Sequence, residues 1–278
     1  MAEKEIDKPV SGIIVPIAIV LGGALIIWAI TKMLSSDTGY KRLVEELHSK
    51  TFGNRWVAAY ELSKYISTSQ IPDEDIPWLV GQLTTVYDES PDPRTKNFIV
   101  LTLGALDHPD RVKVFNKALT EEDEKILFSS IIAIGNLESS EGIEFQPLVE
   151  MLSGKDEGLV QVATLALIGH NQVRAKDKLL TLMESSNPTI KYTAASGVLA
   201  FGDLSALPLV KEIFNLQPDK DYDQTQVQAL KLNALTALGK SKNLNKEVLN
   251  FIESLSQSNV GLAVQTRAKQ VLIELKKP

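Results

Sequence analysis

One helical pattern recurs along most of this chain at intervals of about 31 to 41 residues. Its clearest copies are "RTKNFIVLTLGAL", "KILFSSIIAIGNL", "LVQVATLALIGH", "TIKYTAASGVLAFGD" and "VQALKLNALTALGK". We align them on a column near the end of each copy, occupied by Ser63, Gly104, Gly135, Gly169, Gly202, Gly239 and Ile273. A period of this size indicates a repeat architecture, in which each unit buries its apolar face against its neighbours.

Two further columns describe how these helices are expected to pack. The residue five positions before the glycine column is small in six copies, namely Ala58, Ser130, Thr164, Gly197, Ala234 and Ala268. The residue immediately before the column is large and apolar in all seven. Small side chains at a fixed register let helix backbones approach closely. We interpret the glycines themselves as helix terminators in a left-handed conformation.

Shorter amphipathic segments separate these helices, so each unit is predicted to be a helical hairpin. They begin at Ile76, Arg111, Phe145, Ala175, Ala206 and Asn245. No segment has the alternating pattern of a strand. The sequence therefore predicts an all-α fold, a right-handed α-solenoid of about seven hairpins over residues 34–278.

The pattern resembles the HEAT and armadillo-like repeat family. The endings "LGAL", "IGNL", "IGH", "FGD" and "LGK" carry the resemblance, together with the small and apolar columns. A basic residue common early in the second HEAT helix is matched by Arg94 but not by Leu159 or Ile190. The resemblance implies a solenoid whose second helices line a concave side, and it implies no particular activity.

The N-terminal region predicts a membrane anchor. Residues Val10 to Ile30 carry no charge, and at about 1.5 Å per residue they span roughly the 30 Å of a bilayer core. We divide the chain into a tail (1–9), a transmembrane helix (10–33) and the repeat domain (34–278). A cleaved signal peptide is the alternative, although the apolar run is long for one. Ala18 and Gly22 have a small-xxx-small spacing that suits packing between anchor helices.

Basic residues near the anchor predict its orientation. Two lysines, Lys4 and Lys8, precede it, and four basic residues follow it, Lys32, Lys41, Arg42 and Lys50. This excess favours a cytoplasmic repeat domain. A periplasmic or extracellular domain stays open because the difference is only two residues.

Composition excludes several function classes. The net charge of −6 is unfavourable for a nucleic-acid groove, which requires clustered Lys and Arg. The chain has no cysteine, and its three histidines, His48, His108 and His170, lack a partner at metal-binding spacing. We therefore predict no catalytic residues, no metal site and no cofactor. The acidic run "TEEDE" is interpreted as a helix start with Thr120 as its N-cap, and "PDKDYDQ" as a turn whose Asp side chains cap the next helix.

A partner-binding face is predicted from one more register. Arg55, Lys96, Gln161 and Lys231 stand eight residues before the glycine column, where they would form a polar row for an acidic peptide or protein. Trp56 and Trp78 are candidate binding anchors. A solvated face, and tryptophans that seal the end of the solenoid, are the alternatives.

These features together predict a function. We expect a non-enzymatic, membrane-anchored scaffold or adaptor for other proteins, as a subunit of a bacterial envelope complex. Its contacts would be with other membrane-complex subunits and, through residues 10–30, with the lipid bilayer. The alternatives are a HEAT-like enzyme or lyase with a dispersed site, and a structural homo-oligomer organised by the anchor helix.

Overall fold

The computed structural model describes residues 38–49, 52–68, 71–219, 223–241 and 244–276. These residues form helices joined by short loops and contain no strand. The helices are α2 (Thr38–Leu47), α3 (Phe52–Thr68), α4 (Ile76–Glu89), α5 (Pro93–Gly104), α6 (Arg111–Ala118), α7 (Glu124–Gly135), α8 (Gln146–Met151), α9 (Glu157–Gly169), α10 (Lys176–Leu182), α11 (Pro188–Ala200), α12 (Leu207–Ile213), α13 (Gln224–Lys240), α14 (Lys246–Gln257) and α15 (Leu262–Glu274), with single 3₁₀ turns at Asp73–Asp75, Val173–Ala175 and Leu204–Ala206.

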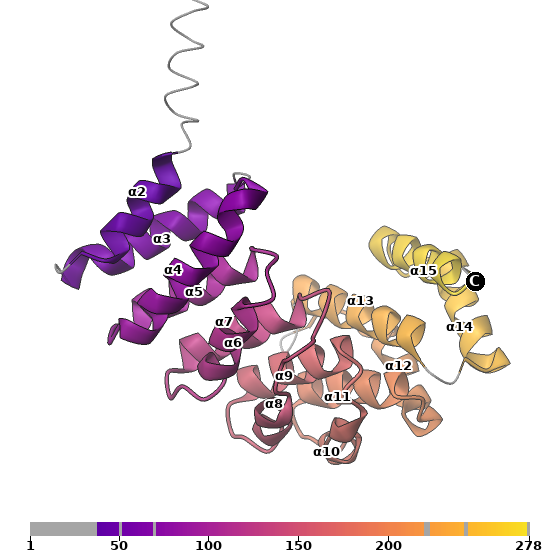
Figure 1. Cartoon of the computed structure of the whole chain (residues 1–278). Coiled ribbons are helices and arrows are strands. Elements are labelled where there is room, and N and C mark those ends of the chain that lie inside the picture. The colour runs from indigo at the N-terminus through magenta and orange to yellow at the C-terminus, as the bar shows by residue number, and fades with distance from the viewer. Residues whose placement is uncertain (1–37, 50–51, 69–70, 220–222, 242–243, 277–278) are drawn as a thin grey trace, which may run out of the picture.

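Successive helices pair into seven hairpins, from α2/α3 to α14/α15, as the sequence predicts. Every second helix from α3 to α15 packs against the second helix of the next hairpin. The first helices touch one another extensively only in the N-terminal hairpins. In the arc of Figure 1, α9, α11 and α13 lie on the inner side of α8, α10 and α12. The second helices thus form a continuous layer on the inner side of the arc, because each of them packs against the next.

Most of the second helices begin at an acidic or amide N-cap. Asp92, Asp123, Asp156, Asn187 and Asp223 each accept hydrogen bonds from the first-turn amides of α5, α7, α9, α11 and α13. Asp223 completes a capping box with Gln226, which confirms the capping role that was predicted for this last Asp of the run "PDKDYDQ". The prediction of Thr120 as the N-cap of α7 is wrong, because α7 begins four residues later. The Thr120 hydroxyl donates to the carbonyl of Lys117 instead.

One apolar core runs through all seven hairpins. Helix α11, at the centre of the stack, contacts α9, α10, α12 and α13. It is therefore buried on nearly every side, and its residues from Thr193 to Ala200 are all buried. This explains its many small side chains: helices surround it, and large side chains would hold their backbones apart.

The prediction of left-handed helix terminators is confirmed for Gly202 and wrong for the other glycines of the column. Only Gly202 has a positive φ, +91°, and it lies two residues beyond the end of α11. Gly104, Gly135 and Gly169 end their helices without a left-handed backbone, and Gly239 lies inside α13. Most of these four face the next hairpin. A Cβ at Gly104 would lie 3.1 Å from the Cβ of Ala133, and one at Gly239 would lie 2.9 Å from a methyl group of Val271. Close approach of neighbouring second helices is what selects glycine there.

Side chains just after the second helices connect the repeats. His170 Nε2 lies 2.6 Å from the carbonyl oxygen of Ile134, so this nitrogen carries the donated proton. Lys240 Nζ donates to the carbonyl of Gly169 at 2.8 Å, and Ser241 Oγ to that of Leu199 at 3.0 Å. These carbonyls end helices α7, α9 and α11, where intrahelical partners are missing. These hydrogen bonds provide the three carbonyl oxygens with donors from another repeat. The Lys240 ammonium also interacts favourably with the negative C-terminal end of the α9 helix dipole.

The predicted anchor lies outside the described residues, as do Ala18 and Gly22. Among the residues that are described, no helix is both long and apolar enough to cross a bilayer.

Candidate partner-binding surface

An exposed apolar strip crosses the inner layer of the first three hairpins. We define the inner apolar strip as Val57 and Tyr60 of α3, Phe98 and Leu101 of α5, and Phe128 and Ile132 of α7. Five of these side chains are between 38% and 44% exposed, and Phe98 is partly buried against the core. Isolated exposed apolar residues are ordinary on protein surfaces, whereas contiguous ones mark interaction sites.

The members of the strip are neighbours. The rings of Tyr60 and Phe98 meet edge to face with centroids 5.2 Å apart, which joins α3 to α5. Helices α5 and α7 approach closely because Gly104 faces Ala133. Leu101 lies one turn before Gly104, on the side of α5 that packs against α7. The strip therefore spans three second helices that pack against one another.

A groove extends the strip toward the fourth hairpin. It has a volume of about 470 Å³ and lies among the starts of α7 and α9 and the side of α5, with Phe128 and Leu159 in its apolar wall. Asn97 also borders it, and the Asn97 Oδ1 atom is buried without a hydrogen-bond partner. A buried unpaired amide oxygen is costly. A small rearrangement that exposed it to a donor from a bound chain would relieve that cost.

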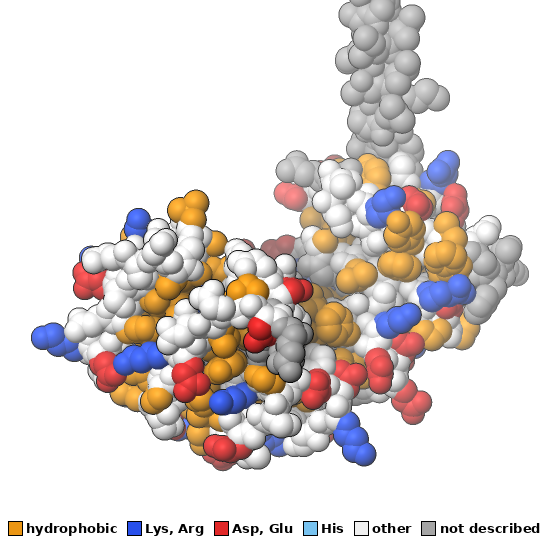
Figure 2. Space-filling model, turned by 180° about the vertical axis from the view of Figure 1, so that it is seen from behind, with side chains coloured by type: hydrophobic (Ala, Val, Ile, Leu, Met, Phe, Trp, Pro, Cys, Tyr) orange, Lys and Arg blue, Asp and Glu red, His pale blue; other side chains and the backbone are white. Residues whose placement is uncertain are grey.

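Basic side chains border the strip. Lys64 Nζ lies over the ring of Tyr60 at 5.2 Å from the centroid, and Arg94 lies over Trp56 at 4.9 Å. Lys125 stands in the wall of the groove beside Phe128, together with the acidic residues Glu124 and Asp156. Figure 2 shows hydrophobic and basic side chains gathered together on the N-terminal part of the molecule. The surface therefore combines apolar anchors with charges of both signs.

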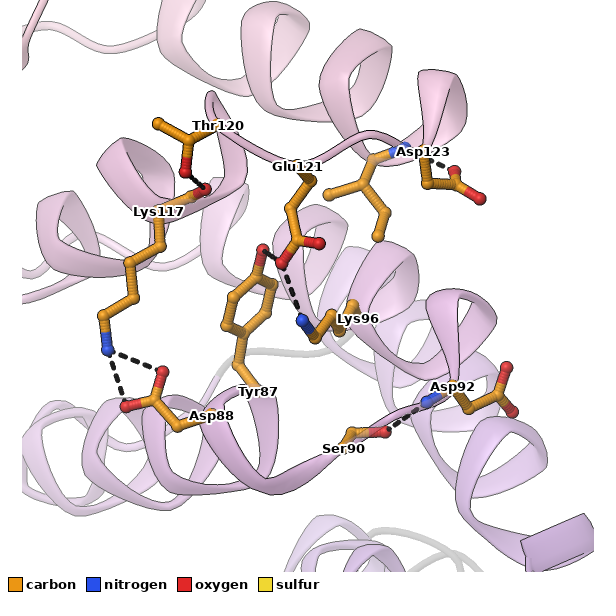
Figure 3. Close-up of polar contacts among 10 residues, drawn as sticks. Tyr87, Asp88, Ser90, Asp92, Lys96, Lys117, Thr120, Glu121 and Asp123 are labelled. Carbon is orange, nitrogen blue, oxygen red and sulfur yellow. Dashed lines mark hydrogen bonds and ion pairs between the residues drawn. The ribbon is translucent and has the colours of Figure 1, made fainter.

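Lys96 lies in a polar network between hairpins (Figure 3). Its Nζ is 2.6 Å from Glu121 Oε1, which also accepts a hydrogen bond of 2.9 Å from Tyr87 Oη. The same ammonium lies over the Tyr87 ring. Burial, and then the hydrogen bond to Glu121, raise the pKa of Tyr87, so its hydroxyl stays a donor at neutral pH. The network ties α4 and α5 to the loop before α7.

Other members of the predicted polar row also have partners within the chain. Arg55 Nε donates to the carbonyl of Ser49 at 2.6 Å, and Lys231 Nζ donates to the carbonyl of Leu216 at 2.8 Å. Gln161 borders a hollow of about 230 Å³ between α9, α11 and α13. The structure thus does not align these side chains as a row of free cations. Their role in partner binding stays a prediction.

The two tryptophans of the N-terminal hairpins differ in environment. Trp56 is partly buried beneath the guanidinium of Arg94. Trp78, on α4, is 40% exposed and has Lys41 Nζ 6.0 Å from its ring centroid. Only Trp56 lies on a second helix, beside Val57 of the strip.

The described part of the chain holds no cluster of side chains with the make-up of a metal site. No three His, Cys, Asp or Glu side chains among those residues are placed to hold a metal ion. His48 lies 2.9 Å from the amide oxygen of Gln82, and His108 Nδ1 accepts from the amide of Asp110. With His170, all three histidines have hydrogen-bond partners within the chain.

Comparisons with known proteins agree with the helical architecture. No family model matches the sequence, and no curated relative matches it. Among solved structures, the complex of CpcE and CpcF of phycocyanin lyase from Nostoc sp. PCC7120 matches with a TM-score of 0.54 and 15% identity, over 85% of this chain and 93% of that one.

Two further solved structures match with lower TM-scores. A designed armadillo repeat protein in complex with the peptide (KR)4 has a TM-score of 0.47 and 17% identity, over 86% of this chain and 100% of that one. An engineered protein has a TM-score of 0.46 and 18% identity, over 85% and 96%. The seven stacked hairpins and the similarity to the lyase complex together show that this chain folds as an armadillo/HEAT-like helical repeat protein.

Proposed function

We propose that this chain is a non-enzymatic interaction scaffold, and that its inner apolar strip binds an apolar segment of a partner protein. The observation that carries the proposal is the strip itself, six apolar side chains on three second helices that pack against one another, five of them about two-fifths exposed. Aromatic residues such as Tyr60, Phe98 and Phe128 supply much of the binding energy where they anchor interfaces.

The chemistry of the strip favours a protein segment over other ligands. An apolar surface gains free energy when it is removed from water, about 25 cal/mol per Å². The adjoining groove has walls from three successive hairpins. An amphipathic helix or an extended chain would place apolar side chains on the strip. Lys64 at the border of the strip would favour a carboxylate next to those side chains.

Photo-crosslinking tests this function in the intact protein. We expect a photoreactive phenylalanine analogue at Phe128 to form crosslinks to a distinct second protein in cells. The same analogue at Val173, which is 40% exposed but lies in the turn before α10, should form none. Crosslinks from both positions, or from neither, would contradict the proposal. Crosslinks only to a second copy of this chain would favour the homo-oligomer instead.

The proposal includes a membrane anchor at residues 10–33, which would display a cytoplasmic repeat domain as part of an envelope complex. Its support is the uncharged stretch from Val10 to Ile30 and the basic residues after it. We expect the full chain to stay with membranes after an alkaline carbonate wash and residues 38–278 to be released. Release of the full chain would contradict the anchor, and it would leave the proposed binding at the inner apolar strip unaffected.

A lyase-like role is the second candidate, favoured by the similarity to the phycocyanin lyase complex. That similarity concerns the fold, at 15% identity. The two candidates differ in what they bind. A new visible absorption band after mixing with a bilin chromophore would favour the lyase, and an unchanged spectrum would favour the scaffold.

A further inference from the structure

Lys231 is an unusual lysine within the described part of the chain. It lies on α13, its side chain is only 7% exposed, and it is the only buried Lys or Arg of the described residues. Its one hydrogen bond there is to the carbonyl oxygen of Leu216, and no described carboxylate pairs with it. An ammonium group has three donors, so two remain. A buried cation that has no counter-ion among the described residues gains free energy when it meets an anion.

Lys231 borders two adjoining spaces near the C-terminal end of the solenoid. One, of about 300 Å³, lies between α13 and the first turn of α15, and the other, of about 450 Å³, extends toward the loop after α12. Val227, Lys231, Val260 and Gly261 belong to both. We call the two together the Lys231 hollow. Its walls are largely apolar on the α15 side, with Leu262 80% exposed at the edge.

The start of α15 adds donors to the same hollow. Helices α5, α7, α9, α11 and α13 each have an Asp or Asn side chain as N-cap, whereas α15 begins after Gly261 and has no capping side chain. Gly261 has φ +107°, and a Cβ there would meet nothing within 4 Å. The residues of this first turn line the hollow, and their amides have no capping side chain. Uncapped amides at a helix start attract anions.

We propose that the Lys231 hollow binds a carboxylate group, with the Lys231 ammonium as its counter-ion and the first-turn amides of α15 as additional donors. One buried cation balances one negative charge, so a carboxylate fits, while a phosphate dianion carries a charge more than the site offers. The apolar walls suit a carboxylate attached to an aliphatic group. Burial, which lowers the pKa of Lys231, also means that an anion would stabilise its charged form. The proposal is independent of the inner apolar strip, which lies at the other end of the solenoid.

Thermal unfolding of the full chain in detergent tests the proposal with three small probes. N-acetyl-leucine carries a main-chain carboxylate, N-acetyl-glutamate amide carries a side-chain carboxylate, and N-acetyl-leucine amide carries neither. We expect one or both acids to raise the unfolding midpoint by about 3 °C at ten times their dissociation constant. The neutral amide should have no effect. A response to N-acetyl-leucine alone would identify the bound carboxylate as that of a chain terminus. A response to N-acetyl-glutamate amide alone would identify it as that of an acidic side chain.

Matched variants make the result specific to Lys231. In Lys231→Met the response to the acids should disappear, whereas Lys240→Met, which loses a lysine from the same helix, should keep it. If Lys231→Met does not fold, Leu262→Glu places a carboxylate at the edge of the hollow and should abolish the response by competition. An equal response to the neutral amide, no response to either acid, or a response that persists in the folded variants would overturn the proposal.

Discussion

Replacing Leu101 and Phe128 together by Asp should weaken binding of the partner protein at least about thirtyfold, since the loss of even one interface anchor costs about 2 kcal/mol. Leu101 lies on the middle helix of the inner apolar strip and Phe128 lies where the strip meets the groove, and they are 40% and 44% exposed. Because neither fills the core, the variant should retain its helical content. The measurement is the dissociation constant of the crosslinked partner for wild-type and variant chains.

A matched control separates the strip from exposed apolar surface in general. Val173 and Leu249 are 40% and 37% exposed, and they lie in the turn before α10 and on α14. Val173→Asp with Leu249→Asp makes the same chemical change away from the strip. Its affinity for the partner should equal that of the wild-type chain. Equal losses in the two double variants would show that the strip has no special role.

Replacing Gly197 by Leu should lower stability by about 3 kcal/mol, because α11 has no room for a side chain at that position. A Cβ there would lie 2.7 Å from Leu179 Cδ1 and 2.9 Å from Ile168 Cδ1. These atoms belong to α10 and α9, so the substitution would separate two hairpins at the centre of the stack. For a domain of this size the unfolding midpoint should fall by roughly 6 to 12 °C.

Gly81 provides the control for this substitution. It lies within α4, is exposed, and a Cβ there would meet nothing within 4 Å. Gly81→Leu should therefore raise stability by about 0.5–1 kcal/mol, because glycine is a poor residue inside a helix. Circular dichroism during thermal unfolding gives both values. If Gly197→Leu were as stable as the wild-type chain, the close packing around α11 would be wrong.

The sequence predicted the hairpins well because their signals are local. Apolar periodicity and the short turns define each helix, and the seven predicted units correspond to the seven hairpins from α2/α3 to α14/α15. The role of the glycines was not predictable in the same way. Whether Gly104 ends a helix or admits Ala133 depends on the neighbouring repeat, and a local pattern contains no such information.

The inner apolar strip was missed although a signal for it exists. Tyr60, Leu101 and Ile132 each stand three residues before the glycine column, while three of the four later copies have a small or polar residue there, Ala166, Thr236 and Gln270. This register became meaningful only once the inner side of the second helices was known. The row chosen instead, eight residues before the column, contains Lys96 and Lys231, which bond to Glu121 and Leu216. A basic residue in a sequence does not reveal an acceptor supplied by a distant loop.

Amide hydrogen exchange of the full chain, with and without the partner protein, tests the central claim most directly. If the inner apolar strip is the binding surface, the partner should slow exchange in α3, α5 and α7 and leave α4, α6 and the C-terminal hairpins unchanged. Slower exchange confined to α4 and α6, or to the hairpins after α11, would contradict binding at the inner strip.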